Sequence, residues 1–303
     1  MAISAKDVQK LREMTGVGMM DCKKALTEAE GDFDKAIELL REKGLAASAK
    51  KAGRIAAEGM AYAAVVDGMG VVVEVNAETD FVAKNEKFVD FVKGVAATVA
   101  ANKPASLEEL MECKYVGTEL TVTQQQQEMV LVIGENIKVR RFHVFAEGTS
   151  VPYIHAGGKI GVLVNLEVEG GIDATEIGKD VAMQIAALNP RFWDKTQVTQ
   201  DVLDEEKKIM MAQMAADPKM ANKPAQVVEK IVVGKLNKFY SENCLLQQEF
   251  VKDGDFTVEK YIASAAKALG GTVTFKDAVR FEKGEGIEKK VDDFAAEVAS
   301  MIK

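Results

Sequence analysis

The sequence predicts an α+β protein in which a small helical domain precedes a core of two related α/β subdomains with antiparallel sheets. Three observations lead to this prediction. Apolar residues recur with helical spacing over residues 1–44, valine-rich segments typical of strands begin at Met60, and one strand–helix pattern occurs twice. The chain has 303 residues, which is enough for about two domains.

Composition excludes several classes of protein. The chain carries 39 Lys+Arg against 47 Asp+Glu, a net charge of −8, so the phosphate backbone of a nucleic acid is a poor main ligand. No apolar run approaches the roughly 20 residues that span a bilayer, and the first residues show no secretory signal, so we expect a cytoplasmic protein. The three cysteines are widely separated, which supports neither a zinc site nor a disulfide framework.

Residues 1–44 predict three short amphipathic helices. The segment from Ser4 to Asp7 fits a capping box that starts the first helix, and Gly44 is expected to end the third. Because each helix has one apolar stripe to bury, we expect the three to pack together as a domain. Residues 45–59 follow as a helical or flexible linker.

The first core subdomain is expected over residues 60–147. Two valine-rich strands flank the dipeptide Asp67-Gly68, which is typical of a hairpin turn. A helix is expected at 85–102, because its apolar residues fall on one face. Further elements are expected as helices at 106–112 and 121–133 and as a strand at 137–145.

The second core subdomain is expected over residues 148–283, with a helical hairpin at about 201–240 inserted in it. Its methionines at 210, 211 and 214 are expected to be core residues of that hairpin. The remaining elements are expected as strands at 151–155, 160–169, 245–251 and 272–281 and as helices around 177–188 and 257–269. Residues 284–303 end the chain with an amphipathic helical module.

The repeat has two copies. The first is the strand Gly70–Asn76 with the helix that follows it, and the second is the strand Gly161–Glu167 with its following helix. The first copy is longer, and its extra residues fall at Thr79–Asn85, between strand and helix. The second copy has only Gly170-Gly171 there. A strand-to-helix connection is a common place for function, so this segment is a candidate site.

Local sequence leaves the roles of three residues open. Asp80 is either a general base or a cap of the following helix, and the pattern favours the cap. Phe81 is either buried in its own subdomain or a functional contact, with neither favoured. His155 lies beside a glycine-rich hairpin turn that lacks the features of a phosphate-binding loop, so an ordinary polar residue is favoured over a proton donor.

Several long strings of the sequence resemble the bacterial elongation factor Ts family over essentially the whole chain. The two most specific are GMMDCKKAL at 18–26 and TDFVAKN at 79–85. The others are IGENI at 133–137, IHAGGKIGVLV at 154–164 and GEGIEK at 284–289, in the order that the family shows.

The resemblance implies a fold and a function. The fold comprises an N-terminal domain similar to ubiquitin-associated modules, two related core subdomains, a helical coiled-coil protrusion and a C-terminal helical module. The implied function is guanine nucleotide exchange on the GTPase elongation factor Tu, which the family binds in its GDP state to speed the release of GDP. The resemblance implies no covalent chemistry, cofactor or resident metal.

The resemblance also implies which residues act. Displacement of the partner's Mg²⁺ would fall to Thr79, Asp80, Phe81 and Val82, with the aromatic ring wedged between partner residues. Further contacts with the GTPase would come from Lys23, Ile133, Gly134, His155, Phe294 and Val298.

Two rival functions follow from the same residues. An acid–base enzyme would use Asp80 and His155, but the sequence supplies no third catalytic group. Alternatively, residues 1–44 would be a ubiquitin-binding module on an unrelated core, against which the repeat and the order of the motifs argue.

Overall fold

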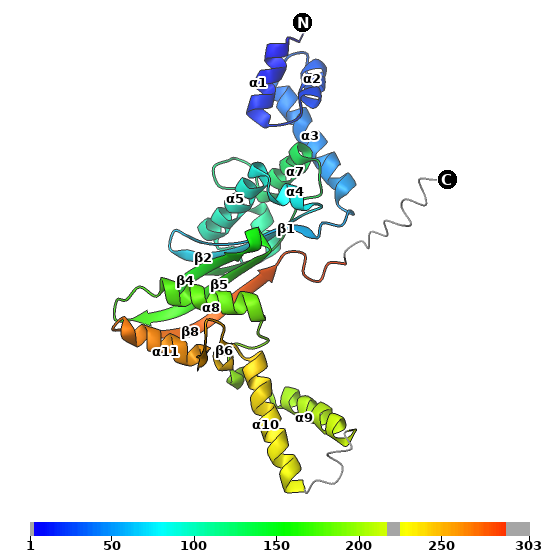
Figure 1. Cartoon of the computed structure of the whole chain (residues 1–303). Helices are drawn as coiled ribbons and strands as arrows, with labels where there is room; N and C mark the ends of the chain where they lie inside the picture. The colour runs from blue at the N-terminus through cyan, green and yellow to red at the C-terminus, as the bar shows by residue number, and fades with distance from the viewer. Residues whose placement is uncertain (1–2, 217–224, 289–303) are drawn as a thin grey trace. The chain divides into compact units, whose positions relative to one another are not determined.

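The computed structural model describes residues 3–216 and 225–288 (Figure 1). These residues form a mixed α/β fold divided into two compact units. Residues 3–144, 154–161 and 281–288 belong to unit 1, and residues 145–153 and 162–280, without the gap at 217–224, belong to unit 2.

Unit 1 begins with the helices α1 (Ala5–Thr15), α2 (Met19–Glu28) and α3 (Phe33–Lys51). The capping box is confirmed, because the Asp7 N–H donates to Ser4 Oγ at 3.2 Å and the Ser4 N–H donates to Asp7 Oδ2 at 3.1 Å. The apolar stripes of the three helices form a core of their own, which contains Leu11, Cys22, Leu26, Ala36 and Leu40.

The prediction that Gly44 ends the third helix is wrong, since α3 continues to Lys51. A glycine inside a helix costs about 1 kcal/mol relative to alanine, so this one needs another reason. The reason is close packing on helix α7 (Val122–Ile133): a Cβ atom at Gly44 would lie 3.3 Å from the backbone oxygen of Gln127. A salt bridge of 3.6 Å between Arg41 and Glu128 joins the same two helices.

The first sheet has the strand order β1-β2-β3. Its strands are β1 (Glu58–Val66), β2 (Met69–Ala77) and β3 (Lys138–Phe145). The antiparallel β1–β2 hairpin turns at Asp67 and Gly68, whose φ angles of 50° and 80° fit the predicted tight turn. Helix α5 (Glu86–Asn102) packs its apolar face on this hairpin, and the short helices α4 (Asp80–Ala83) and α6 (Leu107–Glu112) flank it.

The second sheet repeats this strand order as β4-β5-β8. Its strands are β4 (Thr149–His155), β5 (Ile160–Glu169) and β8 (Thr272–Glu282), and helix α8 (Thr175–Leu188) follows β5 as α5 follows β2. In both sheets two consecutive strands are neighbours, and a strand from much later in the chain lies beside the second. The repeat inferred from the sequence is therefore a repeat of topology.

Unit 2 also holds two longer helices, α9 (Gln200–Ala215) and α10 (Ala225–Asn243), which contact each other. Met210 and Met214 are buried as expected, whereas Met211 is exposed. The remaining elements are the 3₁₀ turns η1 (Ala156–Gly158), η2 (Lys195–Gln197) and η3 (Leu245–Gln247), the strands β6 (Glu249–Phe250) and β7 (Asp253–Thr257), and helix α11 (Val258–Ala268).

The strand expected at 245–251 is largely wrong. The N–H groups of Gln247 and Gln248 both donate to the carbonyl of Cys244 at 3.0 Å. These local bonds close a 3₁₀ turn and leave only the two residues of β6 for strand pairing.

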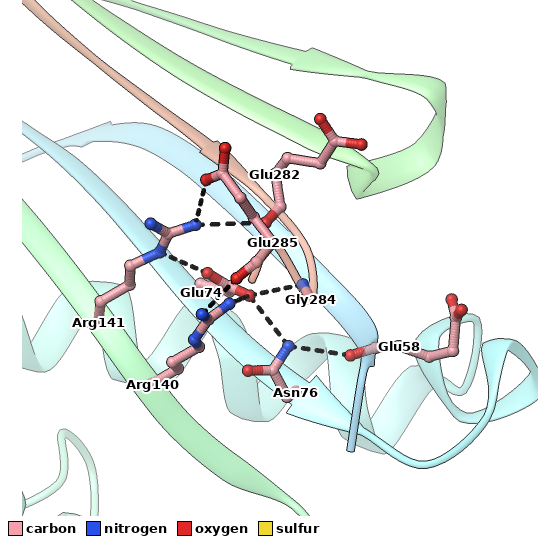
Figure 2. A network of polar contacts seen from close by, with 8 residues as sticks. All are labelled: Glu58, Glu74, Asn76, Arg140, Arg141, Glu282, Gly284 and Glu285. Atoms are coloured by element: carbon pink, nitrogen blue, oxygen red, sulfur yellow. Dashed lines mark hydrogen bonds and ion pairs between the residues drawn. The ribbon is translucent and has the colours of Figure 1, made fainter. Parts of the chain in front are cut away.

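A buried carboxylate, that of Glu74 in β2, joins three segments of unit 1 (Figure 2). Two arginines of β3 donate to it: Arg140 Nη1 lies 2.9 Å from Oε1, and Arg141 Nε lies 2.5 Å from Oε2. The Gly284 N–H, which follows β8, donates to Oε1 at 2.8 Å, and Asn76 Nδ2 donates to the same oxygen at 3.0 Å. The network ties residues 282–285 to the first sheet.

Gly284 is required at this point of the chain. Its φ of 69° lies in the left-handed region, and a Cβ atom there would lie 2.0 Å from the Ala57 carbonyl oxygen. Lys283 next to it pairs with Glu58 of β1 at 2.5 Å. Burial alone raises the pKa of the Glu74 carboxyl, but the hydrogen bonds from Asn76, Gly284 and the two arginines outweigh burial and hold the pKa below its ordinary value of 4.5.

We expect Glu74→Gln to lower the free energy of unfolding at pH 7 by about 2 kcal/mol, because two arginines lose their charged partner. Breaking a fully buried ion pair would cost more free energy, but both guanidinium groups here reach water. The folded-state pKa of Glu74 is lowered, so its contribution is complete above the ordinary pKa and is lost as pH falls through the folded-state value. The difference between wild type and variant should therefore shrink in acid, as measured by urea unfolding followed by circular dichroism at pH 7 and at pH 3.

The matched control is Glu167→Gln, which removes a carboxylate from an exposed ion pair with Lys276. It should unfold like the wild type at pH 7, because exposed pairs contribute little to stability. Equal stability of Glu74→Gln and Glu167→Gln at pH 7 would show that the buried network does not stabilise the fold.

Candidate functional site

The segment between β2 and α5 contains a single helical turn, α4 (Asp80–Ala83). Thr79 caps this turn, since its Oγ1 accepts a hydrogen bond from the Val82 N–H at 3.4 Å. Asn85 caps the next helix, because its side chain accepts from the Lys87 N–H at 2.9 Å. The interpretation of Asp80 as a helix cap is therefore wrong, because Thr79 caps α4 and Asn85 caps α5.

Phe81 is the most exposed large apolar side chain among the described residues, at 80% exposed. Its burial in its own subdomain, one of the two alternatives left open by the sequence, is wrong. Val82 and Ala83 instead turn inward and are buried, and Val82 joins the core formed by the first sheet and α5. Since one helical turn has only one inner side, residues 82 and 83 occupy it and Phe81 points to water.

Asp80 is exposed beside Phe81. Its carboxylate pairs with Lys84 Nζ at 3.3 Å, and both side chains are more than half exposed. An exposed i,i+4 pair of this kind is held weakly and exchanges readily with other partners. The Asp80 carboxylate is therefore available to a ligand or partner at low cost.

A second loop begins where helix α7 ends. Ile133 is half-buried against the core of unit 1, and Gly134 ends the helix with φ 89°, its N–H donating to the Val130 carbonyl at 3.0 Å. Gly134 is exposed, and a Cβ atom added there would have no neighbour within 4 Å. This left-handed turn directs the chain into Glu135 and Asn136.

Two carboxylates bridge this loop to the segment before α4. Glu135 Oε2 accepts from the N–H groups of Glu78 and Thr79 at 3.1 and 3.0 Å, and Glu135 Oε1 accepts from Thr79 Oγ1 at 2.7 Å. In the opposite direction, Glu78 Oε1 accepts from the Asn136 N–H at 2.6 Å. Each loop thus supplies a carboxylate to the backbone of the other, which brings residues 79–82 together with residues 133–134.

Arg54 closes the bridge from the linker before β1. Its guanidinium lies 3.5 Å from Glu78, and its carbonyl accepts from Asn136 Nδ2 at 2.8 Å. Sequence patterns assigned no role to Arg54, Glu78, Glu135 or Asn136. The one available signal was that each glutamate lies next to a candidate residue, but no local pattern connects positions so far apart in sequence.

The other candidate residues lie outside this bridge. Lys23 is exposed on α2, and His155 is exposed at the end of β4. Asp80 and His155 are thus both exposed, so neither has the enclosed surroundings that the acid–base enzyme requires. Phe294 and Val298 lie outside the described residues.

In the described part of the chain, no three or more His, Cys, Asp or Glu side chains gather in a group that could hold a metal ion. No helix within residues 3–216 or 225–288 combines the length and apolar character needed to cross a bilayer.

The chain is similar to known proteins over its whole length. The family model described as Elongation factor TS matches residues 78–285, which begin at the bridging Glu78 and end at Glu285. Elongation factor Ts of Syntrophotalea carbinolica is 49% identical over 307 residues, covering 100% of both chains. Elongation factor Ts of Clostridium kluyveri is 49% identical over 99% of both chains, and that of Clostridium botulinum is 48% identical over 98% of this chain and 97% of its own.

A match that covers both chains from end to end at this identity settles the family: the chain belongs to the elongation factor Ts family of translation elongation factors.

Proposed function

We propose that this chain is the guanine nucleotide exchange factor for elongation factor Tu. It binds the GTPase in its GDP state, displaces Mg²⁺ and promotes GDP release during translation elongation in the cytoplasm. The observation that carries the proposal is the 80% exposure of Phe81 on a loop fixed by the bridge between Glu78, Thr79 and Glu135. No covalent step, cofactor or nucleic acid takes part.

An exposed phenylalanine on a fixed loop fits insertion into a partner. Burying an aromatic side chain removes about 150–250 Å² of surface from water, and the Phe81 ring is free to do this on docking. Because Val82 and Ala83 hold α4 in the core, the ring enters the partner without unfolding its own subdomain. A rigid anchor of this kind loses little conformational entropy on binding.

Asp80 supports the displacement of Mg²⁺. A bound Mg²⁺ keeps several ordered waters and demands near-octahedral geometry. A carboxylate brought beside that water shell competes for the groups that order it. Asp80 is suited to this role because its ion pair with Lys84 is exposed and weakly held.

Exchange requires that binding of the factor and binding of the nucleotide oppose each other. If GDP is held at nanomolar affinity, roughly 12 kcal/mol must be offset, which is more than one phenylalanine supplies. A wide interface made by several parts of the chain supplies the rest. We place its further contacts at Lys23, Ile133, Gly134, His155, Phe294 and Val298. The coupling is reciprocal, so nucleotide also releases the factor and the cycle is reversible.

We infer a modular division of labour along the chain. Residues 1–44 are the module similar to ubiquitin-associated domains, followed by the linker at 45–59. Residues 60–147 and 148–283 are the two core subdomains, with the coiled-coil protrusion at about 201–240 in the second. Residues 284–303 are the C-terminal helical module that also touches the GTPase.

Phe81→Ala should lower the acceleration of GDP release by about 30-fold, the effect of losing an interface anchor that contributes roughly 2 kcal/mol. The fold should be unaffected, because the ring is exposed in the free protein. The measurement is the release of a fluorescent GDP analogue from purified elongation factor Tu at several concentrations of the factor.

The matched control is Val116→Ala, which also trims an exposed apolar side chain of unit 1. It should exchange at the wild-type rate, and circular dichroism should show that both variants are folded. Wild-type exchange by Phe81→Ala would move the mechanism to other contacts, and no exchange by the wild type would refute the proposed function.

Asp80→Asn should slow GDP release in millimolar Mg²⁺ and have little effect in excess EDTA. The reason is that the carboxylate acts on the metal's surroundings, and this step disappears when the metal is removed. The same fluorescent assay, run in parallel with Mg²⁺ and with EDTA, measures both rates. An equal loss under the two conditions would assign Asp80 to general binding instead of Mg²⁺ displacement.

A further inference from the structure

We propose that Glu135 is a positioning residue for nucleotide exchange: its carboxylate fixes the start of α4 and thereby holds Phe81 in the orientation that enters the partner. The inference rests on the proposed function above. It assigns a role to a side chain that is not itself among the proposed contacts.

The first support is the number of donors that one carboxylate satisfies. Glu135 accepts three hydrogen bonds, two from the consecutive N–H groups of Glu78 and Thr79 and one from the Thr79 hydroxyl. Hydrogen bonds to a charged acceptor are stronger than those between neutral groups. Both oxygens of Glu135 are engaged, so the peptide plane between residues 78 and 79 is held from one side.

The second support is that Thr79 passes this constraint on to the helical turn. Its Oγ1 donates to Glu135 at 2.7 Å and accepts from the Val82 N–H at 3.4 Å. Glu135 thus orients the hydroxyl that caps α4. Phe81 lies inside the capped turn, one residue before the N–H that the cap receives.

The third support is that Glu135 is itself held in place. The Asn136 N–H donates to Glu78, and Asn136 Nδ2 donates to the carbonyl of Arg54. The left-handed turn at Gly134 fixes the direction in which the chain leaves α7. The position of the Glu135 carboxylate is therefore fixed by its own neighbours and does not depend on the segment before α4 alone.

Helix α4 needs such support because it is very short. A single helical turn is far below the length at which helices are stable alone, which is about 12–15 residues. Its geometry must be imposed by its neighbours. The buried Val82 and Ala83 fix the inner side of the turn, and the Glu135 bridge fixes its N-terminal end.

The expected consequence is a change in population. Without Glu135, the loop populates other conformations, and the apparent affinity for the partner falls in proportion to the fraction that remains competent. The concentration of factor for half-maximal exchange should therefore rise more than the maximal rate falls. A residue that acted in the metal-displacement step itself would lower the maximal rate instead.

The first experiment uses the full-length protein without partner. Amide hydrogen exchange is followed at Glu78 and Thr79 in wild type, Glu135→Ala and Glu135→Gln. We expect exchange about tenfold faster in Glu135→Ala, because both amides lose a charged acceptor. Glu135→Gln should be intermediate, since its amide oxygen still accepts from the backbone but its NH₂ group cannot accept from Thr79. Glu112→Gln, which removes an exposed carboxylate from the same unit, is the control.

The second experiment measures release of a fluorescent GDP analogue from purified elongation factor Tu. Glu135→Ala should raise the half-maximal concentration about tenfold in the wild-type background, but less than about twofold in the Phe81→Ala background. Such non-additivity is expected only if Glu135 acts through Phe81. Glu112→Gln should match the wild type.

The outcomes separate the inference from the function on which it rests. Unchanged amide exchange in Glu135→Ala, or an equal loss of exchange activity with and without Phe81, would overturn the positioning role while wild-type activity upheld the function. A wild-type protein that fails to accelerate GDP release would overturn the function itself and, with it, the role of Glu135. Unfolding midpoints of the variants measured by circular dichroism identify a loss due to misfolding, and Glu135→Gln then provides the test.

Discussion

The Glu74 carboxylate is the constraint on which the architecture of unit 1 depends. It has no exposed surface, so each of its oxygens needs donors from the protein, and these come from β2, from β3 and from the turn after β8. Removing water from a charged group is expensive unless it is fully hydrogen-bonded. The first sheet therefore reaches its stable form only when the segment at residues 282–285 is docked on it. The turn after β8 and the β1–β2 hairpin are thereby held in one unit.

The same device recurs at the site. The Glu135 carboxylate, like that of Glu74, joins segments that are distant in sequence by accepting from several donors at once. Carboxylates suit this purpose better than apolar contacts, because their bonds are directional and fix orientation as well as distance. An exposed Phe81 gives up about 1.5–3 kcal/mol of burial that its own core would have provided. A fixed loop keeps the ring from recovering that energy by folding back.

Local sequence predicted most of the fold because the signals were themselves local. The Ser4–Asp7 box and the Asp67-Gly68 turn depend on residues a few positions apart, and the topological repeat was visible as repeated strings. Gly44 was misread because its reason is the backbone of α7, which no pattern around residue 44 reveals. Thr79 and Asp80 are adjacent and both have side chains able to cap a helix, and only the backbone conformation selects Thr79. The same holds for the site. Family resemblance pointed to Phe81, but the bridge from Glu135 joins segments that are far apart in sequence and meet only in the folded chain.

Helix α7 connects these observations. Along its side, the backbone at Gln127 and the carboxylate of Glu128 pack on α3, the last of the N-terminal helices. At its end, Gly134 turns the chain so that the Glu135 carboxylate accepts hydrogen bonds from the segment before α4. The N-terminal helices and the Phe81 loop therefore share one short, stiff support within unit 1. Because both are packed on α7, the two surfaces proposed to touch the partner are held at a spacing set by this helix. The cost of Gly44 within a helix has its return here: the missing side chain sets how closely the N-terminal helices approach the element that positions the site.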